Sequence, residues 1–147
     1  MTELAGKTVW ITGASSGIGE AMALLASTRG AQLVLTARRR DELERVRAAC
    51  AHPQDIAVLP LDLTQFDAEG AKREAEAFFG PIDILVNNAG ISQRSLLVDT
   101  SMDVYRRIME LDFFAPVALS KVLIDDMRQH GGGHVVVISS VVGKMGT

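Results

Sequence analysis

Glycines at positions 13, 17 and 19 are spaced so that a phosphorylated ligand can approach the main chain closely. They lie in a segment, residues 12–19, that follows a short apolar stretch and leads into an amphipathic one. A turn of this kind between a strand and a helix presents backbone N–H groups at the positive end of the helix, which favours a phosphate. We therefore predict that Gly13, Gly17 and Gly19 form part of a pyrophosphate cradle, although a glycine-rich turn can also serve only to close a bend.

An arginine follows the second apolar segment, where a dinucleotide-binding fold places the adenosine ribose. Arg38 stands about 20 residues after the glycine turn, at the position that holds an acidic residue in proteins that bind the NAD ribose hydroxyls. A guanidinium instead matches a phosphate bidentately and stacks on adenine. Arg38 thus favours NADP(H) over NAD(H) as cofactor. Arg39 and Arg40 are expected to be solvated, although Arg39 is close enough to assist.

Polar residues follow the later apolar segments as well. Asp62 can accept a hydrogen bond from an adenine amino group or cap the next helix, and the residue types leave both roles open. Asn87 and Asn88 can bridge neighbouring strands and Gly90 can let the chain pass close to a ligand, or the tetrapeptide 87–90 can be an ordinary turn. Ser140 can donate a hydrogen bond to a carbonyl oxygen, although serines in such places are often caps or turn residues.

These segments alternate with helical patterns along the whole chain. Short runs rich in Val, Ile and Leu predict parallel strands covered on both faces, at Thr8–Ile11, Gln32–Thr36, Ile56–Leu59, Ile82–Val86 and Val135–Ile138. Amphipathic stretches predict the helices between them, at Ser16–Thr28, Asp41–Ala51, Asp67–Phe79 and about Met102 to Arg128. Pro116 should kink or split the last helix near Asp112, because proline cannot continue the hydrogen-bond ladder.

The alternation predicts an α/β fold, a doubly wound parallel sheet with strands in the order 3-2-1-4-5. Ligands bind such sheets beyond the carboxyl ends of the strands, where the winding reverses. The glycine turn, residues 87–90 and residues 139–140 should therefore line one crevice. The chain reads as a single domain over residues 1–147, with no internal repeat and no linker.

Composition excludes several other classes of function. The net charge of −3 argues against a nucleic-acid-binding surface, which needs clustered Lys and Arg. Cys50 is the only cysteine, which excludes an intrachain disulfide and fits a reducing, cytoplasmic location. We expect no membrane span, no signal peptide and no metal site.

Taken together, residues 12–19, Asp62, residues 87–90 and residues 139–143 resemble the short-chain dehydrogenase/reductase family. The stretches LVLTARRRDELERV, LPLDLT and IDILVNNAGISQRSLLVDTSMDVYRR are most similar to reductases of retinoids, steroids and related carbonyl compounds. The resemblance implies a Rossmann-type fold and hydride transfer between NADP(H) and the carbonyl/alcohol pair of a small molecule. Relatives that catalyse dehydration or epimerisation keep the same cofactor.

The resemblance also assigns roles to residues. It implies that Ser15, Ser16 and Ile18 contact phosphate and ribose together with the glycines, and that Asp62 and Leu63 hold the adenine. Asn88, Ala89 and Gly90 would line the ribose near the nicotinamide, while Asn87 would brace the strands. Ser140 is similar to the family's catalytic serine. The catalytic and cofactor residues so assigned are Ser140, Asp112, Gly13, Ser15, Ser16, Gly17, Ile18, Gly19, Arg38, Asp62, Leu63, Asn88, Ala89 and Gly90.

Two departures from the family pattern affect the expected chemistry. Asp112 stands where the family has an asparagine that supports a proton relay. The family's Tyr-x-x-x-Lys pair comes after the serine and is absent from this chain, whose one tyrosine is Tyr105. We therefore expect an incomplete NADP(H)-binding domain of a reductase that is inactive alone, or else a nucleotide-binding module without catalysis. The apolar faces of the long helix suit a homo-oligomer interface and core burial equally, and we expect a homo-oligomer.

Overall fold

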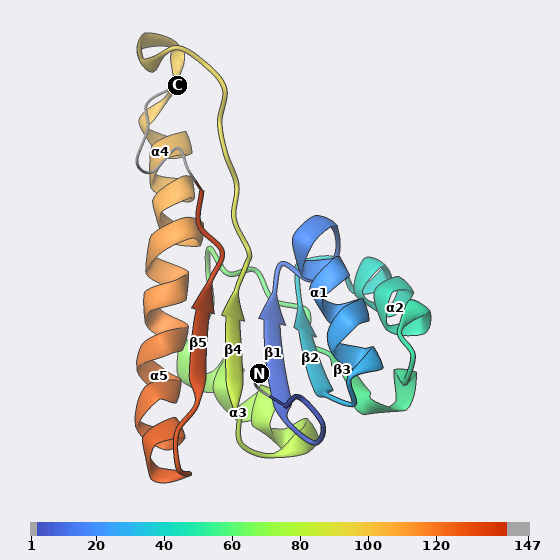
Figure 1. Cartoon of the computed structure of the whole chain (residues 1–147). Helices are drawn as coiled ribbons and strands as arrows, with labels where there is room; N and C mark the ends of the chain where they lie inside the picture. The colour runs from blue at the N-terminus through green and yellow to red at the C-terminus, as the bar shows by residue number, and fades with distance from the viewer. Residues whose placement is uncertain (1–2, 141–147) are drawn as a thin grey trace.

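The computed structural model describes residues 3–140 and contains one five-stranded parallel sheet. The strands run in the order β3-β2-β1-β4-β5, and every pair is parallel. Their bounds are β1 Thr8–Thr12, β2 Gln32–Thr36, β3 Ile56–Val58, β4 Ile84–Asn87 and β5 His134–Val137. The predicted doubly wound fold and its strand order are confirmed (Figure 1).

The later strands differ from their predicted limits by one or two residues. The strand predicted at Ile82–Val86 begins at Ile84 and includes Asn87, and the strand predicted at Val135–Ile138 begins at His134. Ile82 is buried although it precedes the strand. Its apolar character therefore reflects core packing, which a hydrophobic pattern cannot distinguish from strand pairing.

Helices cover both faces of the sheet and create two apolar cores. On one face, α1 (Gly17–Thr28) and α2 (Arg40–Ala49) pack against Ile11, Leu33 and Leu35. On the other face, α3 (Ala68–Phe79) and α5 (Ala115–Gln129) pack against Trp10, Val34 and Leu85. Short 3₁₀ turns lie at η1 (Pro53–Asp55) and η2 (Leu97–Asp99). Strands β1 to β4 are thereby covered on both faces, as their continuous apolar runs predict, whereas the same prediction is wrong for β5, whose residues are all exposed.

The long helical pattern near the end of the chain is interrupted by a wider turn. Helix α4 (Met102–Met109) passes through a π-helical turn, η3 (Glu110–Phe114), into α5. Pro116 lies in the first turn of α5, where its ring lacks an N–H and would clash with the carbonyl four residues earlier, on Asp112. This confirms the predicted interruption near Asp112. The composite helix forms a rod that extends past the carboxyl ends of the strands (Figure 1).

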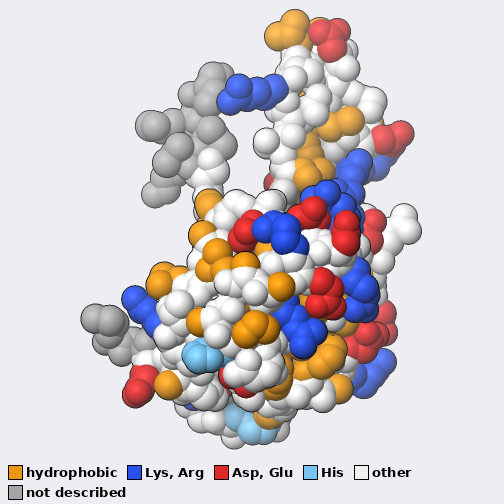
Figure 2. Space-filling view, turned by 90° about the vertical axis from the view of Figure 1, so that its right-hand side faces the viewer, with side chains coloured by type: hydrophobic (Ala, Val, Ile, Leu, Met, Phe, Trp, Pro, Cys, Tyr) orange, Lys and Arg blue, Asp and Glu red, His pale blue; other side chains and the backbone are white. Residues whose placement is uncertain are grey.

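Strand β5 lies at an edge of the sheet and carries exposed apolar side chains. Val135 and Val137 are 39% and 58% exposed, in contrast to the buried valines of the inner strands. No helix within residues 3–140 combines the length and the apolar character needed to cross a membrane. Figure 2 shows acidic and basic side chains intermixed over the side of the molecule that carries α2, without a broad area of either sign.

Candidate nucleotide-binding site

The turn between β1 and α1 requires its glycines for different physical reasons. Gly13 and Gly17 have φ angles of +65° and +59°, which L side chains rarely adopt. A Cβ atom on Gly13 would lie 2.7 Å from the Cα atom of Ala89, and one on Gly19 would lie 2.3 Å from the carbonyl oxygen of Gly13. A Cβ atom on Gly17 would meet nothing within 4 Å. Gly13 and Gly19 thus permit close packing of the main chain, whereas Gly17 permits the turn and leaves the space above it open.

Asn88 joins the end of β4 to this glycine turn. Its side-chain amide nitrogen donates to the carbonyl oxygens of Thr12 and Gly13, at 3.1 Å each. The buried hydroxyl of Thr12 in turn accepts from the N–H groups of Asn88 and Ala89, at 3.0 and 3.1 Å. The prediction that asparagine amides bridge strands is correct for Asn88. For Asn87 it is wrong, because its buried side chain reaches the Ser120 hydroxyl of α5 at 3.4 Å.

A cavity of about 400 Å³ opens at the carboxyl ends of the strands, beside the glycine turn. All the predicted cofactor residues line it except Gly17 and Gly19. Gly19 instead packs beneath the turn, against Gly13. The lining residues are Gly13, Ser15, Ser16, Ile18, Ala37, Arg38, Arg39, Leu61, Asp62, Leu63, Thr64, Asn88, Ala89, Gly90, Ile91, Arg107 and Leu111. The tertiary structure therefore brings together segments that are far apart in the sequence.

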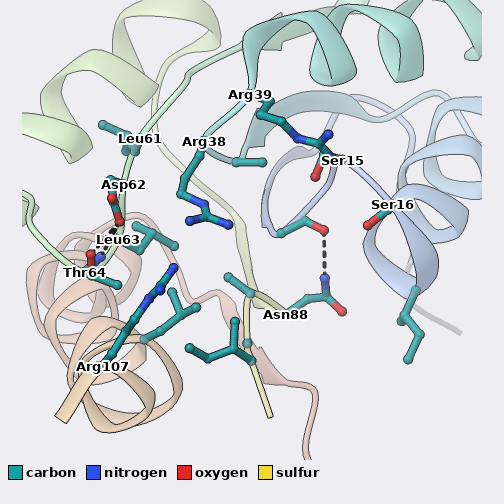
Figure 3. Close-up of a pocket in the computed structure, with 17 residues that line it drawn as sticks. Ser15, Ser16, Arg38, Arg39, Leu61, Asp62, Leu63, Thr64, Asn88 and Arg107 are labelled. Carbon is teal, nitrogen blue, oxygen red and sulfur yellow. Dashed lines mark hydrogen bonds between the residues drawn. The ribbon is translucent and has the colours of Figure 1, made fainter. Parts of the chain in front are cut away.

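Arginine side chains dominate the charge of this cavity. Arg38, Arg39 and Arg107 line it, and within residues 3–140 none of them forms an ion pair. Their sequence neighbours differ, since Arg40 pairs with Glu44 and Arg106 pairs with Asp103. In Figure 3, Arg38 and Arg107 extend into the cavity from opposite sides. Unpaired guanidinium groups around a concave surface are suited to an anionic ligand.

The sequence reasoning missed one of these arginines. Arg39 is exposed, as expected, and it also lines the cavity together with Ser15, so it is placed to assist. Arg107 was not considered, because it lies in α4, 45 positions after Asp62 in a different part of the chain. The sequence offers one local signal for Arg107, its spacing of four residues from Leu111. This spacing puts both residues on one face of the helical segment, and both line the cavity.

Asp62 carries the one acidic side chain in the cavity lining. Its Oδ1 accepts from the Thr64 N–H at 3.0 Å and from the Thr64 hydroxyl at 2.7 Å. These bonds, with Arg38 and Arg107 nearby, hold the pKa of the Asp62 carboxyl below its usual value. The helix-cap role considered for Asp62 is wrong, because Asp67 caps α3 by accepting from the Glu69 N–H. The ionised carboxylate of Asp62 thus closes a tight turn at the edge of the cavity.

The side chain of Asp112, in the π-turn η3, forms a hydrogen bond with the segment that follows β4. Its Oδ1 accepts from the N–H of Ile91 at 2.9 Å. A Cβ atom on Gly90 would lie 3.4 Å from the same oxygen, so the chain passes close to this carboxylate. Ile91 lines the cavity and Asp112 does not. In this structure the Asp112 side chain therefore positions a segment of the cavity wall.

Arg45 of α2 also contacts the glycine turn, at Ser15. Its guanidinium donates to the Ser15 carbonyl oxygen at 3.1 Å and to both carboxylate oxygens of Glu20, at 2.8 and 3.0 Å. It also donates to Glu42 at 2.9 Å. The hydrogen bond with Glu20 is the main reason that the pKa of Arg45 is raised and that of Glu20 lowered. Sequence reasoning missed this contact because it joins two different helices.

The predicted catalytic serine is at the same end of the sheet as the cavity but does not belong to its lining. Ser139 and Ser140 follow β5 at the same end of the sheet, where the Ile138 N–H donates to the Asn87 carbonyl oxygen at 2.9 Å. Ser140 is not among the cavity residues. Tyr105 lies in α4, as predicted, and residues 141–143 of the family motif fall outside the described residues. Within residues 3–140, no group of His, Cys, Asp and Glu is arranged to hold a metal ion.

The chemistry of this site suits a phosphorylated nucleotide. Backbone N–H groups at the start of α1 lie beside the cavity, and Gly13 keeps the main chain accessible. Arg38 and Arg39 follow β2, where no acidic residue is available to bind a free ribose 2′-hydroxyl. Leu61, Leu63 and Leu111 also line the cavity and provide apolar surface for a base.

Comparison with known proteins agrees with this geometry. A family model described as short chain dehydrogenase matches residues 7–147. Human dehydrogenase/reductase SDR family member 7 is 48% identical over 147 residues, a match that covers 96% of this chain and 43% of that protein. An SDR family protein 7-like dehydrogenase/reductase of Anopheles gambiae is 47% identical over 150 residues, with 96% of this chain and 47% of that protein covered. The chain thus spans less than half the length of these curated relatives.

Solved structures resemble the whole described fold. A short-chain dehydrogenase from Streptomyces avermitilis has a TM-score of 0.87 and 37% identity, covering 99% of this chain and 53% of that chain. A metagenomic short-chain oxidoreductase, crystallised in complex with NADP, has a TM-score of 0.91 and 30% identity, covering 99% and 67%. The fold, the glycine turn and the sequence matches lead to one conclusion: the chain belongs to the short-chain dehydrogenase family.

Proposed function

We propose that this chain is the NADP(H)-binding part of an oxidoreductase that interconverts a carbonyl and an alcohol on a small molecule. The observation that carries the proposal is the cavity at the strand ends, which combines an open glycine turn with Arg38 and Arg39, neither of which forms an ion pair within the described part of the chain. The NADP held by the metagenomic relative supports the choice of nucleotide.

The fit of the cofactor rests on features of this chain. Glycine occupies positions 13 and 19, where a Cβ atom would clash with the neighbouring main chain, and the space above Gly17 is open. The N–H groups at the start of α1 would bind the diphosphate, and Arg38 would bind the 2′-phosphate. A bound NADPH supplies the hydride.

The other residues hold this arrangement in place. Asn88 fixes the glycine turn relative to β4, and Arg45 fixes it relative to α2. Ser140 would donate a hydrogen bond to the carbonyl oxygen of the substrate, which increases the positive character of the carbon that accepts hydride. A cytoplasmic location and a homo-oligomeric state stay predictions.

The cofactor preference can be tested by reversing the charge that follows β2. Dissociation constants for NADPH and NADH should be measured by calorimetry on the protein at its full natural length, with and without Arg38→Asp. We expect the variant to lose at least about tenfold in NADPH affinity and to gain in NADH affinity, because a charged hydrogen bond to phosphate is replaced by a repulsion. An unchanged NADPH affinity would show that the assignment of the 2′-phosphate to Arg38 is wrong.

A second measurement on the same protein tests the proposed catalytic activity. We expect NADPH oxidation that depends on an added aldehyde or ketone and that falls when Ser140 is replaced by Ala. Tight NADPH binding without any carbonyl-dependent oxidation would favour the nucleotide-binding module without catalysis.

A further inference from the structure

Arg107 approaches the cavity from the side opposite to the glycine turn. It lies in the last turn of α4, and Leu111, one turn later, also lines the cavity. One face of the α4–η3 segment is therefore directed at the site. Figure 3 shows the Arg107 side chain extending from this segment toward Leu63 and Arg38.

The surroundings of Arg107 differ from those of Arg39. In Figure 3, Arg107 lies on the side of the cavity that carries Leu63, Asp62 and Thr64, where the buried Leu63 and the half-buried Leu61 provide apolar surface. Arg39 lines the cavity together with Ser15 and Ser16, at the end where the backbone N–H groups of α1 begin. Phosphate oxygens are better matched at that end, whereas a flat, uncharged base is better matched beside Leu61 and Leu63.

Arg107 is available to such a base. Within residues 3–140 it forms no ion pair, whereas the adjacent Arg106 bonds Asp103 at 2.9 Å. Asp62 lines the same cavity, and its carboxylate is already engaged by Thr64. A guanidinium is planar and weakly hydrated, so it stacks on aromatic rings at little cost in desolvation.

We propose that Arg107 is a nucleotide-binding residue that stacks on the purine base of the bound dinucleotide, across the cavity from Arg38. The inference rests on the proposed nucleotide-binding function and assigns to α4 a contact with the base. Arg38 then distinguishes NADP from NAD through the 2′-phosphate, and Arg107 recognises the adenosine that the two cofactors share.

Two small nucleotides separate these roles. Adenosine 5′-monophosphate and adenosine 2′,5′-bisphosphate share the base and differ in the 2′-phosphate. Their dissociation constants should be measured by calorimetry on the full-length protein and on Arg107→Gln, Arg107→Lys and Arg106→Gln. We expect Arg107→Gln to weaken both nucleotides by the same factor, roughly fivefold, because the base contact is common to both.

The other variants act as controls on charge and position. Arg107→Lys keeps the positive charge but lacks the planar guanidinium group, so it should lose affinity as Arg107→Gln does. Arg106 pairs with Asp103 and does not line the cavity, so the Arg106→Gln variant should bind both nucleotides normally. The inference is overturned if the loss in Arg107→Gln is confined to the bisphosphate, if it is absent, or if lysine restores full affinity. If the unsubstituted protein binds neither nucleotide, the proposed function itself is wrong.

Discussion

The side-chain amide of Asn88 donates a hydrogen bond of 3.1 Å to the carbonyl oxygen of Gly13, 75 positions earlier in the chain. The same amide nitrogen would lie 2.5 Å from a Cβ atom on Gly19. Asn88 therefore occupies the space that a side chain at position 19 would need. The shape of the glycine turn depends on a contact with the end of β4 as much as on the glycines themselves.

The glycines should accordingly differ in their tolerance of alanine. Gly19→Ala would press a methyl group against backbone, which we expect to lower the free energy of unfolding by about 2 kcal/mol and to abolish tight NADPH binding. Gly17→Ala should cost only about 1 kcal/mol, since it incurs strain at positive φ without a steric contact. Urea denaturation and calorimetric titration of both variants check this order, and equal effects on unfolding would contradict it.

Arg45 should influence nucleotide binding without touching the nucleotide. Glu20 lies in the first turn of α1, where its carboxylate would repel a bound diphosphate if Arg45 did not neutralise it. We expect Arg45→Met to weaken NADPH binding, more strongly at low salt, and Glu20→Gln in the same protein to restore part of the loss. The measurement is a double-mutant cycle of dissociation constants at two salt concentrations.

A matched control for this cycle is Arg40→Met, which removes another exposed arginine of α2 that pairs only with Glu44 within the described chain. Its NADPH affinity should stay unchanged. A loss in Arg45→Met that Glu20→Gln does not reduce would show that Arg45 acts through the Ser15 carbonyl alone.

Asp112 should act in the structure as a hydrogen-bond acceptor, a role that does not require its charge. Asp112→Asn keeps a carbonyl oxygen for the Ile91 N–H, so we expect little change in stability, within about 0.5 kcal/mol. Asp112→Leu removes the acceptor and should lower stability by about 1 kcal/mol. Hydrogen exchange of the Ile91 amide reports this directly, and protection that persists in the leucine variant would refute the role.

Glu76 should make the stability of the fold depend on pH. Burial between α3 and α5 raises the pKa of its carboxyl above its usual value, and the repulsion from Asp126 adds to this, although the attraction of Lys72 opposes it. Because the folded state favours the protonated acid, stability is greatest below the unfolded pKa and is lost as the pH rises through the folded one.

Glu76→Gln removes this dependence. We expect the variant and the parent protein to have the same Tm near pH 4, and the variant to have the higher Tm at pH 7. Thermal unfolding at a series of pH values tests the expectation. A Tm difference that is independent of pH, or that has the opposite sign at pH 7, would contradict it.

The local sequence determined the architecture and much of the site. Apolar runs between helical patterns predicted the strands and their order, because the period of the hydrophobic residues is a local property and parallel crossovers have one hand. Gly13 and Arg38 were recognisable from the strands that precede them, because the ends of neighbouring parallel strands necessarily meet at one edge. The interruption beside Asp112 followed from Pro116 alone.

Only the tertiary structure decided which side chains contact one another at that edge. The bonds from Arg45 to Ser15 and from Asp112 to Ile91 join segments 30 and 21 positions apart, and the arrival of Arg107 in the cavity depends on the course of the whole α4–α5 rod. The same holds for Asp62, whose residue type suits a helix cap and a tight turn equally. Such contacts depend on how helices pack over the sheet, and the packing is set by the cores on both faces rather than by any short stretch of sequence.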